Sequence, residues 1–348
     1  MTVNVALIGY GLAGAAFHAP LIAAEPRLRL AQVVSSRKDE VARAFPEARV
    51  SRDADTALAD DEIDLVVIAT PNESHATLAR DALRAGKHVV VDKPFVVDPA
   101  DGADLIGLAR ERGRMLSVFH NRRWDGDFRT VAKLLEEGKL GEIALAEFRW
   151  DRFRPAIKQG WREVPHEGAG LLADLGPHLI DQTIRLFGHP EAIQADIIGQ
   201  RADALVEDYF EIALHYGRRR VILSAASLVA KSRPRFALHG TQGSFVKHGI
   251  DPQEAKLRAG GSPQDPDYGI EPADAYGILT DAEGSRPVPS EPGDWRIFYQ
   301  NVADAILNAA PPPVDPADAL MGLAIIECAR RSAREGRLLR FDPPVQSS

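Results

Sequence analysis

An acid and an imidazole stand four residues apart in the segment Gly168–Gln182, at a spacing that suits proton transfer. On a helix, Asp174 and His178 would share one face. A carboxylate beside an imidazole can orient the ring and keep it basic, which suits a general acid or base near neutral pH. Because such a pair is more often structural than catalytic, the spacing alone leaves both roles open.

A lysine follows an apolar run in the segment Val89–Phe95. Three valines lead into Asp92, Lys93 and Pro94, so we expect Lys93 at the carboxyl end of a strand. Ligands bind at that edge of open α/β sheets. A lysine there can reach a hydroxyl or carbonyl group of a substrate, although a surface lysine is the favoured interpretation when Lys93 is taken alone.

A glycine pattern typical of dinucleotide binding follows the strand-like run Val3–Ile8 and opens an Ala-rich helical stretch. In G-x-G-x-x-G, the first glycine permits the tight turn, the second lets the pyrophosphate approach the backbone, and the third lets helix and strand pack closely. The helix N-terminus then offers free N–H groups to the phosphates. A glycine turn without a ligand is the alternative. The predicted cofactor contacts in this turn are Gly9, Gly11, Leu12, Ala13 and Gly14.

The residues after the second expected strand bear on the choice between NAD and NADP. NAD-selective folds usually carry an acid about 20 residues after the glycines, where it binds the ribose hydroxyls. This chain instead has Ser35, Ser36, Arg37 and Lys38 there. Arginine can bind a 2′-phosphate through paired hydrogen bonds, whereas an acid would repel it. We therefore predict NADP, with NAD as the less favoured cofactor and solvation of the two cations as the alternative reading. The predicted contacts are Ser35, Ser36 and Arg37.

These candidate residues need elements to position them, and the first third of the chain alternates apolar runs with helical stretches. The expected strands are Val3–Ile8, Leu28–Val34, Ile63–Ala69, His88–Val91 and Met115–Phe119, and the expected helices include Ala76–Ala85 and Ala100–Arg112. Strands that alternate with helices indicate right-handed βαβ units and a doubly wound parallel sheet. We therefore predict an α/β Rossmann domain over residues 1–122.

The pattern changes near Trp124, where strand-like runs begin to follow one another with only turns between most of them. These runs are Ile143–Trp150, Ala192–Ile198, Tyr209–His215, Arg220–Leu228, Phe236–His239 and Ser244–Lys247, and helices are expected at Asp127–Glu137, Leu171–Phe187 and Pro316–Arg334. This order predicts an α+β C-terminal domain with a large, mostly antiparallel open sheet over residues 123–342, followed by a tail at 343–348. The Pro-, Gly- and Asp-rich segment Gly260–Gly293 is expected to hold little regular structure.

Composition narrows the classes of protein that this chain could be. Its 348 residues are 45% apolar and 26% charged, which fits two globular domains. The net charge of -8 argues against a protein that binds nucleic-acid phosphates. Cys328 is the one cysteine, so we expect a core thiol and predict no disulfide and no metal site. No basic leader and no apolar run near the ~20 residues that span a bilayer are present, so we expect a cytoplasmic protein without a membrane partner.

Four motifs together resemble the Gfo/Idh/MocA oxidoreductase family. They are GYGLAG at Gly9–Gly14, TPNESH at Thr70–His75, DKP at Asp92–Pro94 and D-x-x-x-H at Asp174–His178, and the likeness covers nearly the whole chain. The chain is most similar to a bacterial branch that includes NADP-dependent scyllo-inositol dehydrogenases. That closer likeness is carried by Ser117–Asp125, Asp151–Pro155 and Asp174–Gln182.

The resemblance implies roles for particular residues. The family's lysine, aspartate and histidine correspond to Lys93, Asp174 and His178. Before the lysine the family usually has Glu where this chain has Asp92, which keeps the charge but shortens its reach. The bond before the family's proline, here Lys93–Pro94, is often cis, which would aim the lysine into the cleft. Further cofactor contacts implied by the resemblance are Thr70, Pro71, Asn72, His75, Asp92, Lys93 and Asn121.

The resulting hypothesis is reversible oxidation of a secondary alcohol of a polyol, inositol or sugar, with NADP as hydride acceptor. His178 takes the hydroxyl proton, Lys93 stabilises the developing alkoxide, and Asp174 orients His178 or binds a substrate hydroxyl. Proton transfer would thus come from one domain and the hydride acceptor from the other. Weaker candidates for substrate contact, each with an equal chance of a structural role, are Arg122, Arg152, Arg154 and Trp161. An open sheet with one uncovered face predicts a homodimer, or a tetramer.

Two other functions remain open on the sequence. One is a redox-neutral enzyme of the same fold, such as a glycosidase that keeps its nicotinamide bound. The other is a non-catalytic sensor of NADPH. The set of Lys93, Asp174 and His178 argues against the sensor, because a sensor needs no acid or base.

Overall fold

The computed structural model describes residues 2–157, 163–165 and 168–343. Contacts between residues divide the chain into two compact units. Unit 1 comprises Met1–Trp124, Pro252–Tyr268 and Asp294–Leu320, and unit 2 comprises Asp125–Asp251, Gly269–Gly293 and Met321–Ser348. The predicted boundaries, 1–122 and 123–342, were contiguous, whereas unit 1 also takes two later segments. The last residues, 344–348, lie outside the described part of the chain.

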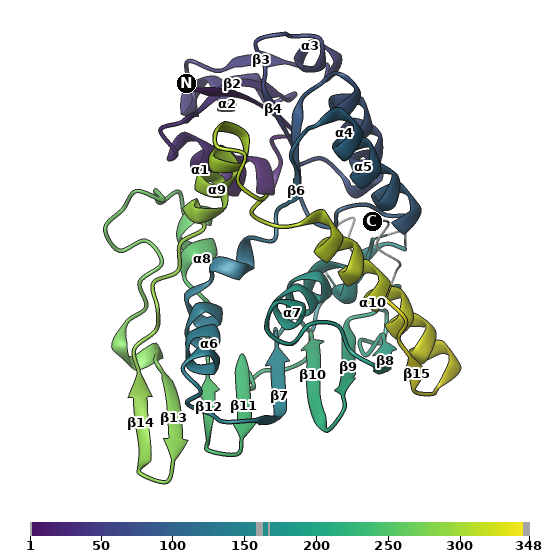
Figure 1. The fold of residues 1–348 in the computed structure, drawn as a ribbon, viewed down its shortest axis with the longest axis vertical. Coiled ribbons are helices and arrows are strands. Elements are labelled where there is room, and N and C mark those ends of the chain that lie inside the picture. Colours follow the sequence, from purple (N-terminus) through teal and green to yellow (C-terminus); the bar gives the residue numbers. More distant parts are fainter. Residues whose placement is uncertain (1, 158–162, 166–167, 344–348) are drawn as a thin grey trace. The chain divides into compact units, whose positions relative to one another are not determined.

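Unit 1 is built on a six-stranded parallel sheet (Figure 1). Its strands are β1 (Val3–Ile8), β2 (Leu28–Val34), β3 (Arg49–Ser51), β4 (Leu65–Ile68), β5 (His88–Val91) and β6 (Leu116–Val118). Their order is β3-β2-β1-β4-β5-β6, and every pair is parallel. This is the predicted Rossmann sheet. The short strand β3 was not predicted, since three residues carry little periodicity.

Helices connect the strands of unit 1. They include η1 (Gly14–His18), α1 (Ala19–Ala23), α2 (Lys38–Ala44), α3 (Asp55–Leu58), η2 (Asn72–Ser74), α4 (His75–Arg84), α5 (Pro99–Arg112) and η3 (Asn121–Trp124). Helix α5 shows how local sequence sets the ends: the Asp98 side chain accepts a hydrogen bond from the Ala100 amide at 2.9 Å, and Gly113 ends the helix with φ 60°. Helices α4 and α5 pack against each other.

The later segments of unit 1 supply α8 (Gln253–Arg258) and α9 (Arg296–Leu307), which the sequence analysis did not anticipate. Helix α9 brings large rings into the core of unit 1. Trp295, Phe298 and Tyr299 are fully buried there. The Phe298 ring meets Phe119 edge-to-face, with centroids 4.9 Å apart. Burial of these rings explains why unit 1 extends past the predicted boundary.

Unit 2 is built on a nine-stranded sheet, which confirms the predicted open and mostly antiparallel architecture. Its strands are β7 (Ile143–Arg149), β8 (Ala192–Ile198), β9 (Tyr209–Tyr216), β10 (Arg219–Ala226), β11 (Phe236–Gly240), β12 (Gly243–Lys247), β13 (Gly277–Asp281), β14 (Gly284–Val288) and β15 (Leu339–Arg340). They lie in the order β14-β13-β12-β11-β7-β10-β9-β8-β15, with β7 and β10 as the parallel pair.

One prediction for unit 2 was wrong. The segment Gly260–Gly293 was expected to hold little regular structure, but it contains η5 (Ala273–Ala275) and the β13–β14 hairpin. The hairpin extends the sheet beyond β12. In β13 the exposed Ile278 is followed by the buried Leu279, the alternation of a half-buried strand. The surrounding Pro, Gly and Asp residues concealed this short pattern.

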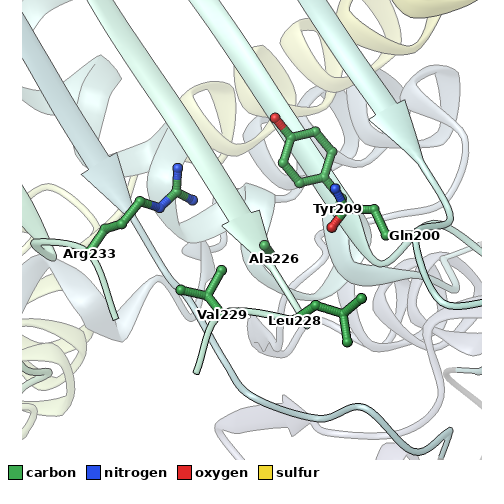
Figure 2. Close-up of a pocket in the computed structure, with 6 residues that line it drawn as sticks. All are labelled: Gln200, Tyr209, Ala226, Leu228, Val229 and Arg233. Atoms are coloured by element: carbon green, nitrogen blue, oxygen red, sulfur yellow. The ribbon is translucent and has the colours of Figure 1, made fainter. Parts of the chain in front are cut away.

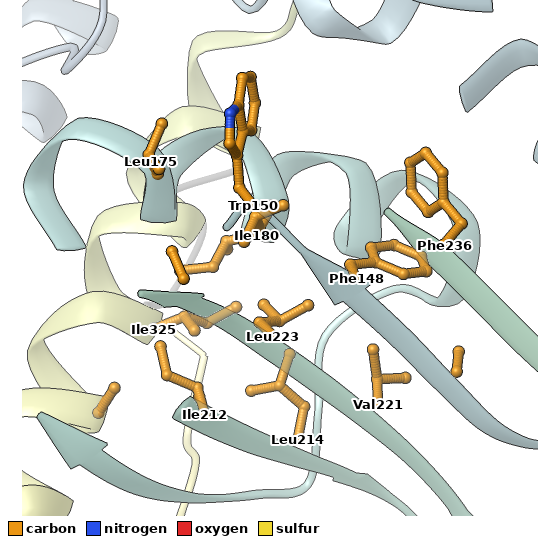
Figure 3. Packing of buried hydrophobic residues seen from close by; sticks show 14 of the residues in the cluster. Phe148, Trp150, Leu175, Ile180, Ile212, Leu214, Val221, Leu223, Phe236 and Ile325 are labelled. Atoms are coloured by element: carbon orange, nitrogen blue, oxygen red, sulfur yellow. The ribbon is translucent and has the colours of Figure 1, made fainter. Parts of the chain in front are cut away.

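Three helices complete unit 2 and its core. They are α6 (Gly126–Glu136), α7 (Leu171–Phe187) and α10 (Pro316–Glu335), close to their predicted ranges. Helix α7 packs on β9 and β10. Figure 3 shows the buried side chains that join these elements, with Ile180 and Ile325 from helices near Leu223 and Phe148 from strands. Cys328 is buried on α10, as expected for a core thiol. Among the described residues, no helix is long and apolar enough to cross a membrane.

Candidate active site

The glycine turn after β1 has three glycines with different surroundings. Gly9 has φ 101°, and a Cβ there would lie 2.5 Å from the Ala69 carbonyl oxygen. A Cβ on Gly14 would overlap the Gly9 carbonyl. A Cβ on Gly11 would meet no atom within 4 Å, so this position faces open space. The turn therefore fits a dinucleotide, whose pyrophosphate needs free access to the backbone at the second glycine. Leu12 is half exposed, and Ala13 is partly exposed.

The turn after β2 presents the residues predicted to choose the cofactor. The Ser35 hydroxyl accepts a hydrogen bond from the Arg37 amide at 3.0 Å. The Arg37 side chain is about half exposed, and its Nη1 lies 3.4 Å from Oε2 of Glu40. Glu40 occupies the first turn of α2. The pKa of Tyr10 is raised, first by burial and then by the charge of Glu40, while Arg37 opposes the rise. Arg37 is therefore an exposed cation beside the glycine turn.

The turn after β4 is tied to the segment after β5 by one histidine. The His75 ring is buried, with Nδ1 2.8 Å from the Pro94 carbonyl oxygen and Nε2 3.0 Å from the Thr70 carbonyl oxygen. The Thr70 hydroxyl lies 2.6 Å from that of Ser74. Pro71 precedes η2, and Asn72 begins it. His75 thus holds together two of the predicted cofactor segments.

Lys93 follows β5 at the carboxyl edge of the sheet, as predicted. The Lys93–Pro94 bond is cis, as the family resemblance implied. The Lys93 amide donates a hydrogen bond to Oδ1 of Asp92 at 2.8 Å. Burial alone would raise the pKa of Asp92, but neighbouring His18, Lys93 and His75 outweigh burial and hold that pKa below its usual range. Asp92 is therefore an ionised group beside the candidate catalytic lysine.

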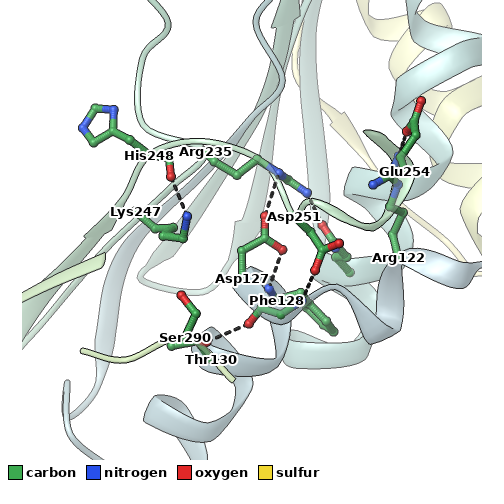
Figure 4. Close-up of polar contacts among 12 residues, drawn as sticks. Arg122, Asp127, Phe128, Thr130, Arg235, Lys247, His248, Asp251, Glu254 and Ser290 are labelled. Atoms are coloured by element: carbon green, nitrogen blue, oxygen red, sulfur yellow. Dashed lines mark hydrogen bonds and ion pairs between the residues drawn. The ribbon is translucent and has the colours of Figure 1, made fainter. Parts of the chain in front are cut away.

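Two more predicted residues lie in η3 of unit 1. Asn121 is buried. Arg122 is also buried and forms a close ion pair with Glu254 (Figure 4). Its guanidinium lies 5.0 Å from the centroid of the Trp295 ring. These contacts give Arg122 a structural role within unit 1, and its predicted contact with substrate stays a prediction.

In unit 2, helix α7 carries Asp174 and His178 one turn apart. Oδ2 of Asp174 lies 3.2 Å from Nη1 of Arg152, so the structure brings together two of the predicted site residues. His178 is buried, and its ring lies 6.0 Å from that of Trp150, at 35° between planes. Arg154 is exposed. Trp161, another predicted substrate contact, lies outside the described residues.

A buried cation near His178, Arg235, was not among the predicted site residues. Arg235 donates a hydrogen bond to Oε1 of Gln182 at 2.8 Å, and its Nε lies 3.8 Å from Oδ2 of Asp127 (Figure 4). The guanidinium also lies 5.0 Å from the centroid of Trp150, the ring beside His178. A charged residue directly before the apolar strand β11 was the available signal. Its partners come from distant segments, which no local pattern indicates.

A pocket opens on unit 2 at the ends of β9 and β10 (Figure 2). Its lining residues are Gln200, Tyr209, Ala226, Leu228, Val229 and Arg233. None of them was a predicted site residue. Arg233 binds Asp151 with Nε and Nη2, at 2.9 and 2.8 Å. The guanidinium is therefore engaged by a buried carboxylate, which fits a structural role at this edge of the sheet.

Family models match both halves of the chain. A model described as "oxidoreductase family, NAD-binding Rossmann fold", from the Gfo/Idh/MocA group, matches residues 3–120. A second model from the same group, described as "oxidoreductase family, C-terminal alpha/beta domain", matches residues 132–341. The two matches cover most of the chain.

Curated relatives and solved structures are similar over nearly their whole length. The chain is 39% identical to scyllo-inositol 2-dehydrogenase (NADP⁺) of Bacillus subtilis, with 98% of this chain and 96% of that protein covered. It is 44% identical to an uncharacterised oxidoreductase of Escherichia coli, covering 95% and 96%. The structure of an oxidoreductase from Bacillus subtilis superimposes with a TM-score of 0.95 at 38% identity, covering 98% and 99%. One from Klebsiella pneumoniae gives 0.92 at 42% identity, covering 99% and 96%.

Proposed function

This chain belongs to the Gfo/Idh/MocA oxidoreductase family, and from that premise we propose that it is an NADP-dependent dehydrogenase of an inositol, polyol or sugar. The reaction would be reversible oxidation of a secondary alcohol to a ketone. A relative of 39% identity is named for this kind of reaction, which supports the substrate class. A second relative, of 44% identity, bears only the name oxidoreductase, which supports the family and does not name a substrate.

One observation carries the proposal: three turns of unit 1 meet at one edge of the parallel sheet. The glycine turn follows β1, the Thr70–His75 turn follows β4, and Lys93 follows β5. Gly9 abuts Ala69, and His75 contacts both Thr70 and Pro94. A lysine is thus held at the edge where a dinucleotide binds in this fold. This arrangement supports a reaction at the cofactor rather than cofactor binding alone.

NADP fits the residues at this edge. Gly11 leaves room for the pyrophosphate, and Arg37 offers an exposed guanidinium suited to a 2′-phosphate. Glu40 lies near that guanidinium at 3.4 Å, so a phosphate would replace an exposed and weak ion pair. When bound, the nicotinamide supplies the acceptor for the hydride that leaves the alcohol carbon.

Residues of the chain itself accept the hydroxyl proton and stabilise the charge on the substrate oxygen. His178 accepts the hydroxyl proton as general base. The Lys93 ammonium stabilises the negative charge that develops on the substrate oxygen. Asp174, paired with Arg152, orients His178 or binds a further substrate hydroxyl. In the reverse direction, His178 returns the proton to the ketone oxygen.

A substrate panel tests the proposal directly. The purified protein is mixed with inositols, polyols and sugars, each with NADP and with NAD, and nicotinamide absorbance is followed. We expect reduction of NADP by at least one compound, and much slower reduction by a Lys93→Ala variant. Release of a leaving group without net reduction would instead support a redox-neutral enzyme. Tight NADPH binding without any turnover would support a sensor.

A further inference from the structure

Four residues of unit 1 form a polar chain that the proposed mechanism does not use in full. The Tyr299 hydroxyl lies 2.6 Å from Nδ1 of His18. Nε2 of His18 lies 3.9 Å from Oδ1 of Asp92. The same carboxylate oxygen accepts the hydrogen bond from the Lys93 amide at 2.8 Å. The chain therefore runs from α9, through the end of η1, to the candidate catalytic lysine.

The first two members of this chain are completely buried in apolar surroundings. Tyr299 and His18 are both 0% exposed. The His18 ring lies 4.2 Å from the ring of Phe119, centroid to centroid, and the Phe298 ring lies 5.2 Å from that of Tyr299. A buried hydroxyl or imidazole is costly unless it is hydrogen-bonded. Phenylalanine or leucine would pack equally well at these two positions. The Tyr299 hydroxyl and the His18 ring nitrogens therefore need an explanation other than packing.

The direction of the first hydrogen bond follows from the surroundings of Tyr299. Burial, and then the charge of Asp92, raise the pKa of Tyr299, so its hydroxyl keeps its proton and can donate to Nδ1 of His18. When Nδ1 accepts, the proton of the neutral ring lies on Nε2. Nε2 is the atom that faces Asp92. At 3.9 Å this is an electrostatic contact rather than a hydrogen bond.

Three groups act on the Asp92 carboxylate. Lys93 contributes its backbone amide at 2.8 Å, and His18 presents Nε2. His75, which contacts the Pro94 carbonyl, also acts electrostatically on the carboxylate. An oriented carboxylate fixes the Lys93 backbone, because a free rotation of Asp92 would release the amide. Without a proton on Nε2, the lone pair of His18 would face Asp92 and repel it.

We propose that Tyr299 and His18 are positioning residues for Lys93. Tyr299 selects the His18 tautomer with the proton on Nε2, and that tautomer holds the Asp92 carboxylate where it receives the Lys93 amide. The inference rests on the proposed function for the role of Lys93 in turnover. It adds two residues to which neither the family motifs nor the named relatives give a role.

The tautomer of His18 can be measured without substrate. Nitrogen-15 NMR of the imidazole rings distinguishes protonated from unprotonated nitrogens, and the His18 signals are assigned by their loss in His18→Gln. We expect a protonated Nε2 and an accepting Nδ1 in the unaltered protein. Tyr299→Phe keeps the ring and removes only the donor, so the two tautomers should then mix. A proton found on Nδ1 of the unaltered protein would overturn the inference.

Turnover provides the second measurement. Tyr299→Phe should lower kcat about three- to tenfold, the kinetic equivalent of one hydrogen bond, with the Kd for NADPH unchanged. Asp92→Asn should lower kcat as well, and adding Tyr299→Phe to it should cause no further loss, because both act through one carboxylate. Tyr268→Phe, in the same buried cluster, is the matched control and should leave kcat unchanged.

The outcomes separate this inference from the proposed function. Equal kcat for Tyr299→Phe and the unaltered enzyme, at equal melting temperature, overturns the inference and leaves the proposed function standing. If Tyr299→Phe lowers kcat by the same factor in the Asp92→Asn variant as in the unaltered enzyme, the inference is also overturned. Losses that multiply in this way come from residues that act independently. If no compound of the panel reduces NADP, the proposed function fails, and the NMR result still decides whether Tyr299 sets the His18 tautomer.

Discussion

At the scale of single residues, the candidate site depends on charges placed at the ends of strands and at the start of a helix. Arg37 is exposed after β2, and Lys93 follows β5 beside an ionised Asp92. Asp174 is paired with Arg152 on unit 2, one turn from His178. Each charge lies at an element end, where the backbone is held by the fold and the side chain can meet a ligand. Substitution of these residues should therefore change binding or turnover more than stability.

Arg37→Ala should weaken NADP binding about ten- to a hundredfold and leave NAD binding nearly unchanged. Only NADP carries the 2′-phosphate, and a lost charge-assisted hydrogen bond is worth about 1.5–3 kcal/mol. Titration calorimetry with both cofactors measures the two affinities. Arg43→Ala, at an exposed position of helix α2, which follows Arg37, is the control. Equal losses for NADP and NAD would contradict the assignment of Arg37.

His178→Ala should lower turnover by about a hundredfold or more, the usual scale for a positioned proton-transfer group, while NADP still binds. Lys93→Ala should also lower turnover, and the double variant should lose less than the product, because the proposed mechanism assigns both groups to one substrate oxygen. Steady-state kinetics and a melting curve on the same sample measure the effect. His189→Ala, at an exposed site just past α7, is the control.

A packing role for His178 would give a different pattern. The ring is buried beside Trp150, so its loss would then lower the melting temperature. Turnover per folded molecule would stay the same. That result would remove His178 from the mechanism.

At the scale of elements, strand β5 begins with a histidine whose charge is disfavoured. Nδ1 of His88 accepts a hydrogen bond from the Met115 amide at 2.9 Å. Burial, and then the positive charge of Arg114, lower the pKa of His88 to about 4. Protonation would therefore both bury a charge and break a link between β5 and the segment before β6.

This lowered pKa predicts a loss of stability in mild acid. The folded pKa lies below the unfolded value of about 6.5, so the unfolded state binds more protons between the two. The contribution of His88 is complete above pH ~6.5 and is lost as the pH falls toward 4, with about 2 kcal/mol gone at pH 5. Urea unfolding at pH 7.5 and pH 5 measures the change, and His88→Asn should flatten it. The same slope in both proteins would exclude His88 as its source.

How far the sequence predicts these elements depends on how local their signals are. Strands β1, β2 and β5 and helix α7 carry long or strongly apolar patterns and were predicted to within a residue or two. The β13–β14 hairpin has five-residue strands with Pro, Ser and Arg, so its pattern was hidden. The contact of Tyr299 with His18 joins residues 281 positions apart. Such a pairing depends on tertiary structure and has no local signal.

At the scale of the whole molecule, the open face of the unit 2 sheet bears on assembly. Val221 and Leu223 face the core of unit 2, because side chains alternate along β10. Three exposed apolar residues lie at or just past the ends of strands in this sheet. Phe153 and Leu228 form a β-bridge and are 59% and 40% exposed, and Ile198 is 45% exposed.

We predict a homodimer that buries this cluster of Phe153, Ile198 and Leu228, since exposed apolar groups of this kind mark interfaces. Leu228→Glu should shift the dimer to monomer, because a carboxylate would have to be buried. Light scattering at micromolar concentration measures the mass. Leu338→Glu, at an exposed leucine elsewhere in unit 2, should leave the dimer intact. A monomer in the unaltered protein would contradict the prediction.

The division of unit 1 into three chain segments has a consequence for synthesis on the ribosome. The chain passes from one unit to the other after residues 124, 251, 268, 293 and 320. The Rossmann strands emerge first, yet Trp295, Phe298 and Tyr299, which fill part of their core, are translated near the end. The nascent unit 1 therefore keeps part of its apolar surface uncovered while most of unit 2 is translated. During that interval the growing chain exposes apolar surface of the kind that chaperones bind, and neither unit can complete its core before synthesis of the other is nearly complete.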